Sequence, residues 1–236
     1  MAETDWKLDG CCNNEQITFC CLFAVFIVVN YFLWNTFVLK PIKLLAVFIH
    51  EMSHAIACWM TCGTVKGIEV YTNEGGVTKY VGGVRIFVIP AGYLGTAFWG
   101  GAFTVLSSQR VASTVIASLM IAALILTLKF SPNKTVVGIS FGFIGLNLLV
   151  IFLEWFVFSP LLVFVVLYYG VSIGTFAVYD IYDDLITRTV DGSDAKACHE
   201  VIPCCFPKCV GVQFVLVAFF FQGLAIYLAL VWMGSV

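Results

Sequence analysis

The chain has 236 residues, of which 61% are hydrophobic and 11% are charged, and its mean hydropathy is +1.00. This composition places it among polytopic membrane proteins, with the lipid bilayer as its main environment. The net charge is −2 and the basic residues are scattered, which excludes an extended nucleic-acid surface. We therefore expect an integral multi-pass membrane protein, in a membrane that the sequence does not identify.

Apolar runs of about 20 residues divide the chain into about seven helices. We expect these helices at residues 18–39, 41–62, 91–107, 111–129, 136–155, 161–182 and 210–233. Prolines stand at or near several of their beginnings, where a missing backbone donor is tolerated. Glu154 lies near the end of its helix, and we expect its side chain to reach the membrane surface. The predicted fold is an all-α polytopic membrane protein.

One segment between the predicted helices has the pattern of a sheet. Residues 67–88 read GIEVYTNEGGVTKYVGGVRIFV, in which β-branched and aromatic runs flank an Asn-Glu-Gly-Gly turn signal. An open sheet edge cannot face lipid. We expect a small β-hairpin at the membrane interface, directly after the second helix, with an ordinary loop as the alternative.

The second predicted helix carries the sequence His50-Glu51-Met52-Ser53-His54-Ala55. His50 and His54 are four residues apart, so on a helix both imidazoles project from one face and can bind one metal ion. A metal-dependent hydrolase needs two such imidazoles for Zn²⁺ and a carboxylate that takes the proton from the metal-bound water. We expect zinc at His50 and His54, with Glu51 as the general base.

A tetrahedral zinc site needs a third protein ligand, which we seek among the acidic residues and cysteines. The sixth predicted helix ends in Asp180, Asp183 and Asp184. Asp180 reaches deepest into the helix and is the preferred ligand, with Asp184 and Asp183 as alternatives. Those two carboxylates could instead orient an imidazole or end the helix in the cytosol.

The distribution of Lys and Arg residues predicts the orientation in the membrane. With a cytosolic amino terminus and alternating spans, nine basic residues fall inside and three fall outside. The nine are Lys7, Lys66, Lys79, Arg85, Lys129, Lys134, Arg188, Lys196 and Lys208, and the three are Lys40, Lys43 and Arg110. We expect residues 1–17 and the cysteine-containing loop 185–209 to be cytosolic.

These motifs resemble the site-2 protease family of intramembrane zinc metalloproteases, in particular its eukaryotic B-like peptidase branch. The HExxH helix is followed by Pro-Ala-Gly-Tyr-Leu-Gly at 90–95, then by the D-x-x-D-D pattern from Asp180, and then by Ser193-Asp194-Ala195. The resemblance implies a single transmembrane metallopeptidase-like domain over residues 18–233. It also implies zinc held by two His and a distant Asp. The chain lacks the Asn-Pro-x-x-Asp-Gly context in which better-known members carry that Asp.

The leading functional hypothesis is a zinc endopeptidase that cleaves a membrane protein or peptide in or near the bilayer. A catalytically inactive relative that binds a membrane protein, or serves as a subunit of a larger membrane complex, is the alternative. A transporter with a buried His-Asp proton relay is a third interpretation. We expect substrate contacts at Val70 and Val77, where the hairpin would receive an added strand, and at Asn147 and Gly92.

Overall fold

The computed structural model describes residues 8, 11–131, 133–182, 194–202 and 206–234. Its elements, in chain order, are α1 (Asn14–Leu33), η1 (Phe37–Leu39), α2 (Lys40–Met60), β1 (Thr64–Val70), β2 (Gly76–Val81), α3 (Arg85–Val88), α4 (Ala91–Leu106), α5 (Arg110–Thr127), α6 (Lys134–Phe156), α7 (Leu161–Tyr182), α8 (Asp194–Val201) and α9 (Pro207–Gly234). The seven predicted long helices are present. Within the described ranges, six helical stretches are long and apolar enough to cross a membrane, whereas α4 has only 16 residues. The predicted class, an all-α polytopic membrane protein, is confirmed.

The first helix begins earlier and ends earlier than predicted. Asn13 forms a capping box with Gln16, in which each side chain accepts a hydrogen bond from the other residue's backbone N–H, both at 2.8 Å. This pair satisfies two of the free amide donors at the helix start, so α1 begins at Asn14. The helix ends at Leu33, and the short 3₁₀ helix η1 precedes α2.

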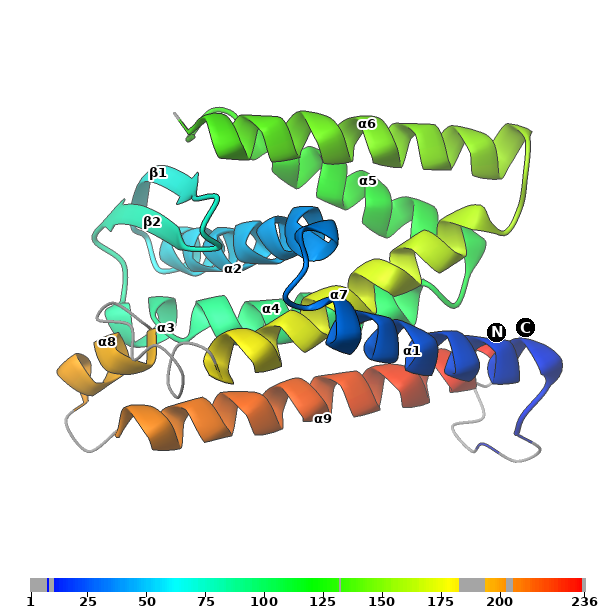
Figure 1. The fold of residues 1–236 in the computed structure, drawn as a ribbon. Helices are drawn as coiled ribbons and strands as arrows, with labels where there is room; N and C mark the ends of the chain where they lie inside the picture. The colour runs from blue at the N-terminus through cyan, green and yellow to red at the C-terminus, as the bar shows by residue number, and fades with distance from the viewer. Residues whose placement is uncertain (1–7, 9–10, 132, 183–193, 203–205, 235–236) are drawn as a thin grey trace.

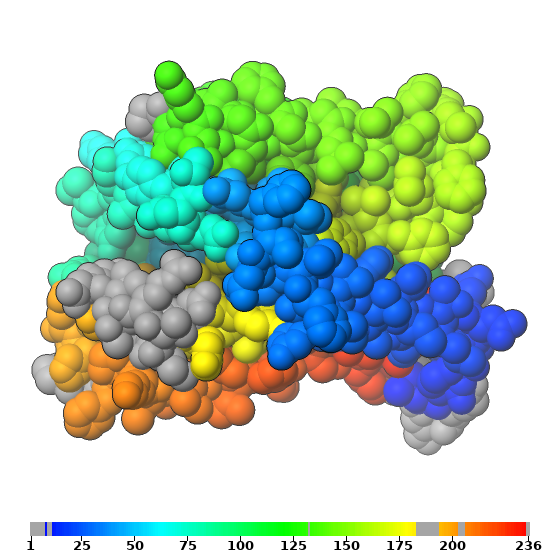
Figure 2. Space-filling view, viewed as in Figure 1, coloured from blue at the N-terminus to red at the C-terminus, as the bar shows by residue number. Residues whose placement is uncertain are grey.

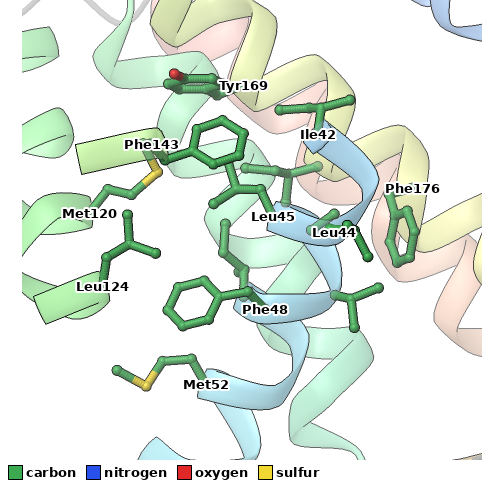
Figure 3. Close-up of a cluster of buried hydrophobic side chains, with 14 of the residues drawn as sticks. Ile42, Leu44, Leu45, Phe48, Met52, Met120, Leu124, Phe143, Tyr169 and Phe176 are labelled. Atoms are coloured by element: carbon green, nitrogen blue, oxygen red, sulfur yellow. The ribbon is translucent and has the colours of Figure 1, made fainter. Parts of the chain in front are cut away.

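Helix α2 is the central element of the fold. Its apolar side chains pack against α5, α6 and α7 in the largest buried cluster, which includes Leu45, Phe48, Met120, Phe143 and Tyr169 (Figure 3). Leu45 and Phe48 are almost completely buried. A helix that is covered on nearly all sides can be apolar around most of its circumference, so its few polar residues mark the side that faces the functional site.

Small residues allow α4, α7 and α9 to approach one another closely. A Cβ atom added to Gly100 of α4 would lie 2.7 Å from the backbone nitrogen of Gly174 in α7. A Cβ on Gly174 would in turn collide with the Gln222 side chain of α9. Glycine at these positions permits the backbone contact that is usual between membrane helices.

The predicted hairpin is present with shifted bounds. Strands β1 and β2 pair antiparallel, with Ile68 opposite Thr78 and Val70 opposite Gly76. The outer edge of β1 lies against the turn between α5 and α6, because the Ile68 amide donates to the Phe130 carbonyl at 3.2 Å. Residues 85–88, which were predicted as the end of the hairpin, form α3 instead. The predicted 185–209 loop likewise contains α8.

The two ends of the helical bundle carry different parts of the chain (Figure 1). The first turn of α1 shares one groove with Ser108 after α4, Pro160 before α7 and Met233 near the end of α9. At the other end lie the hairpin, α3 and α8, which we call the hairpin end. Helix α1 runs parallel to α7, since Phe19 packs against Leu167 and Trp34 stacks on Tyr179 at 4.2 Å between ring centroids.

This arrangement corrects the predicted relation between the amino terminus and the cysteine-containing loop. They were expected on the same side of the membrane, but α1 starts at one end of the molecule and α8 lies at the other. The reason is the course of α2, which does not run back antiparallel to α1. Lys43 near its start already contacts the hairpin, through an ion pair with Glu74 at 3.0 Å. In the space-filling view the hairpin, in cyan, lies against the start of α2, in blue (Figure 2).

Candidate metal centre and active site

Helix α2 brings the three residues of its motif together, as the spacing predicts. The Nε2 atoms of His50 and His54 are 3.1 Å apart, and a carboxylate oxygen of Glu51 lies within 4.8 Å of ligand atoms of both. Glu51 and His54 are buried, with 5% and 8% of their surfaces exposed. The motif therefore forms one compact group of metal-binding and proton-accepting atoms at the hairpin end of the molecule.

A carboxylate that the sequence did not single out as a ligand completes this group. Asp194, the first residue of α8, places Oδ2 at 3.1 Å from the Nε2 atom of His50 and at 3.1 Å from that of His54. Burial would raise the pKa of the Asp194 carboxyl, but the two neighbouring imidazoles outweigh burial and hold it well below its usual range. The sequence signal was Ser193-Asp194-Ala195, which lies outside every predicted span.

Hydrophobic packing fixes the position of α8 and hence of Asp194. Ala195 is completely buried in a cluster with Tyr93 of α4, Ile181 of α7 and Val210 and Phe214 of α9. Three helices therefore hold the first turn of α8 in place. This explains how a residue outside the long helices reaches the two imidazoles.

Asp180, the predicted third ligand, lies in the last turn of α7. It is close enough for its charge to act on His50, and among the described residues Asp194 lies within ion-pair distance of both imidazoles. The alternatives Asp183 and Asp184 lie outside the described residues. The assignment of Asp180 thus stays a prediction, while the geometry favours Asp194.

The ring of His54 is oriented by the main chain of α3. Its Nδ1 atom lies 2.7 Å from the carbonyl oxygen of Val88, which can only accept a hydrogen bond. This partner assigns the proton to Nδ1 and leaves the Nε2 lone pair directed at the site. The ring of His50 packs edge-on against Tyr93, with centroids 4.9 Å apart.

Helix α4 crosses the two imidazoles at a glycine. A Cβ atom at Gly92, one of the predicted substrate-contact residues, would lie 2.3 Å from the Nε2 atom of His50 and 2.5 Å from that of His54. A Cβ at Gly95 would meet the Ser53 hydroxyl at 2.2 Å. The PAGYLG segment therefore supplies the space in which the ligand atoms converge.

Strand β2 contacts the carboxylate of Glu51. The hydroxyl of Thr78 lies 2.7 Å from Oε2 and 2.8 Å from the backbone carbonyl oxygen of Glu51. A Cβ atom at Gly76 would be 2.4 Å from Oε1. The hairpin predicted at the interface is thus part of the site, and the roles of Thr78 and Gly76 were not anticipated from the sequence.

The donor set fits a zinc ion. Three ligand atoms around tetrahedral Zn²⁺, at bonds of about 2.0–2.1 Å, are about 3.3 Å apart. The Nε2 atoms of His50 and His54 and the Oδ2 atom of Asp194 form a triangle with all three sides at 3.1 Å. Two imidazoles and one carboxylate are the ligands typical of a catalytic zinc site with an open position.

The other predicted substrate residues lie in different surroundings. Asn147 is fully buried between α6 and α7 and donates a hydrogen bond to the Phe143 carbonyl at 2.7 Å. Val70 is also fully buried, and its carbonyl accepts a hydrogen bond from the side chain of Asn133 at 2.8 Å. Val77 on β2 is 39% exposed and is the accessible member of this group.

Comparison with known proteins agrees with this site. The Peptidase M50B-like family model matches residues 21–226, a range that contains every residue of the group around His50. No curated protein and no solved structure matches the chain. Because the match covers most of the sequence, the chain belongs to the Peptidase M50B-like family, and it is a multi-pass membrane protein.

Proposed function

We propose that this protein is an intramembrane zinc endopeptidase whose metal ligands are His50, His54 and Asp194. The observation that carries the proposal is the triangle of ligand atoms with sides of 3.1 Å, next to the buried carboxylate of Glu51. A metal ion would compensate all three converging ligand atoms at once, whereas without one an imidazole must carry a proton between them in an apolar surrounding, which costs free energy.

The residues of the site have distinct roles in peptide hydrolysis. Zinc, when bound, would act as a Lewis acid that activates water and polarises the scissile carbonyl. Glu51 accepts a proton from the attacking water and returns it to the leaving amine. The carbonyl of Val88 keeps His54 in the tautomer that presents Nε2, and Gly92 leaves room beside both imidazoles.

We propose that the hairpin end faces the cytosol and that α1 begins on the opposite side. Of the ten described Lys and Arg residues, seven lie in the hairpin, α3 and α8 or at helix ends next to them, and only Arg110 lies at the opposite end. The other two, Lys40 and Lys43, lie at the start of α2, near the middle of the molecule in Figure 1. This asymmetry supports a cytosolic hairpin end. The proposal keeps the cysteine-containing loop cytosolic and moves the amino terminus across the membrane.

The substrate is proposed to be a membrane-protein segment that pairs with the outer edge of β2. Among the described residues, backbone hydrogen bonds join β2 to β1, and none engages the other edge of β2. The face of β2 that carries the Thr78 side chain contacts Glu51, so a strand added at this edge would continue the sheet beside the site. A strand added there would gain backbone partners after its helix unwinds and would bring a peptide bond to the site.

In the β1–β2 register the N–H of Val77 faces Glu69 of β1. The N–H groups of Gly76, Thr78 and Tyr80 face the outer edge instead. The strand-addition proposal therefore predicts an effect of Tyr80→Pro, which removes a donor from that edge. Cleavage of a helical transmembrane reporter should slow, with zinc content unchanged. A short extended peptide that carries the same cleavage sequence should be affected less. Equal losses for both substrates, or no loss for either, would contradict pairing with β2.

A direct test of the enzymatic proposal compares the purified wild type with Glu51→Gln on a library of membrane reporters. The wild type should cleave at least one reporter, and Glu51→Gln should lose cleavage while retaining zinc. If neither protein cleaves any reporter while both bind membrane partners equally, the protein is the catalytically inactive binding subunit instead.

A further inference from the structure

The carboxylate of Glu51 is held from outside its own helix. In an isolated helix, a Glu side chain rotates among several staggered conformers, and only some of them direct the carboxylate toward the metal ligands. Glu51 is buried, and the described contacts of its two carboxylate oxygens come from strand β2. The hairpin is therefore in a position to select the conformer of the general base.

Two residues of β2 make these contacts. The Thr78 hydroxyl approaches Oε2 at 2.7 Å, and the Cα of Gly76 lies so close to Oε1 that an added Cβ would be 2.4 Å from it. Gly76 and Thr78 are two apart on a strand, so both face the same side. The carboxylate thus fits between a hydrogen-bond donor and a glycine, and a larger residue at position 76 would displace it.

The position of β2 itself is fixed on both sides. Lys43 of α2 pairs with Glu74 in the turn, at 3.0 Å, with the Lys43 side chain only 7% exposed. The Thr78 hydroxyl also approaches the backbone carbonyl of Glu51 at 2.8 Å, so the strand is aligned with the main chain of α2 as well as with the carboxylate. A small displacement of the hairpin would consequently move the Glu51 side chain.

We propose that Thr78 is a positioning residue of the active site, whose hydroxyl holds the Glu51 carboxylate in the conformer that accepts the proton from water, with Gly76 keeping the space for it. The inference rests on the proposed peptidase function. It assigns the Thr78 side chain no contact with substrate or metal. It gives the hairpin a role in the chemical step in addition to substrate pairing.

The kinetic test uses full-length protein and a cleavable membrane reporter. Thr78→Val keeps the shape of the side chain and removes the hydroxyl, whereas Thr78→Ser keeps the hydroxyl. Thr64→Val makes the same change at an exposed position of β1. A hydrogen bond to a charged group corresponds to about a tenfold or larger change in rate. Thr78→Val should lower kcat about tenfold with zinc content and KM unchanged, while Thr78→Ser and Thr64→Val should stay within about threefold of the wild type.

Two kinetic results would overturn the proposal. One is a Thr78→Val protein with wild-type kcat, and the other is a loss of kcat that is equally large in Thr78→Ser. If Thr78→Val does not fold, Gly76→Ala decides the question. This variant should displace the carboxylate and lower kcat with zinc retained, and unchanged kcat would refute the positioning role.

A second measurement does not depend on activity. The effect of Thr78→Val on the thermal midpoint is compared in chelator-treated protein, once in the wild type and once in a Glu51→Leu background. The substitution should lower the midpoint in the wild type by about 3 °C or more beyond the loss that it causes in the Glu51→Leu background. Equal losses in both backgrounds would mean that the two side chains do not interact. If the wild type shows no Glu51-dependent cleavage, the proposed function fails, and this cycle alone then decides the Thr78 proposal.

Discussion

Arg110 of α5 and Glu154 of α6 form an ion pair at the end of the bundle opposite the metal centre, with Nε 2.9 Å from Oε1. The side chain of Glu154 is fully buried and that of Arg110 is 40% exposed. Glu154 also accepts hydrogen bonds from the Ser159 hydroxyl at 2.7 Å and the Leu162 amide at 2.8 Å. The carboxylate thus joins α5 and α6 to the start of α7, and the expectation that it reaches the membrane surface is wrong.

This asymmetry of exposure predicts unequal effects of removing each partner. Arg110→Met leaves a buried carboxylate without its cation and should destabilise the protein by about 3 kcal/mol, or roughly 5–10 °C in thermal midpoint. Glu154→Gln leaves a partly exposed guanidinium and should cost less. The double variant should be more stable than Arg110→Met alone. A double variant with the summed loss of both single variants would show that the pair is not coupled.

A substitution at Gly92 shows whether metal binding needs the space beside the two imidazoles. Gly92→Ala places a methyl group where the Nε2 atoms of His50 and His54 converge, so at least one ring must move. We expect zinc affinity to fall about tenfold or more, measured by competition with a chelator. Gly138→Ala on α6 is the matched control, because a Cβ atom there meets nothing within 4 Å. Equal affinities of the two variants would argue against a metal at this position.

The proposed orientation can be tested with single cysteines in a cysteine-free background. Cys62 follows α2 at the hairpin end, and Ser108 lies in the turn between α4 and α5 at the opposite end. In sealed vesicles, a membrane-impermeant thiol reagent on the cytosolic side should label Cys62 and leave a Ser108→Cys variant unlabelled. Asn14→Cys should behave like Ser108→Cys. Labelling of Asn14→Cys together with Cys62 from the cytosolic side would restore the alternating arrangement.

Local sequence patterns predicted the parts of this fold that depend on interactions between residues close together in the chain. The helical spacing of His50 and His54 determines their common face, and the turn residues before Gly76 determine the hairpin. Apolar runs located the long helices because each must satisfy its backbone within the membrane. The capping box of Asn13 is also a local signal, and it could have given the true start of α1.

The parts that local patterns did not predict depend on tertiary packing. Asp194 reaches the imidazoles only because Ala195 is buried among helices that are distant in sequence. Glu154 is buried because a partner from another helix compensates its charge. The expected antiparallel course of the first two long helices is not found, because the start of α2 already lies beside the turn of the hairpin. None of these contacts produces a periodic pattern of residues in the sequence.

His50, His54 and Asp194 are proposed to bind one zinc ion. The most direct measurement is elemental analysis of the purified wild type beside Asp194→Asn and Asp180→Asn. We predict about one zinc per chain in the wild type and in Asp180→Asn, and loss of zinc in Asp194→Asn, because only the last variant removes a ligand. A zinc-free wild type that still cleaves its reporter, or zinc retained by Asp194→Asn and lost by Asp180→Asn, would contradict this assignment.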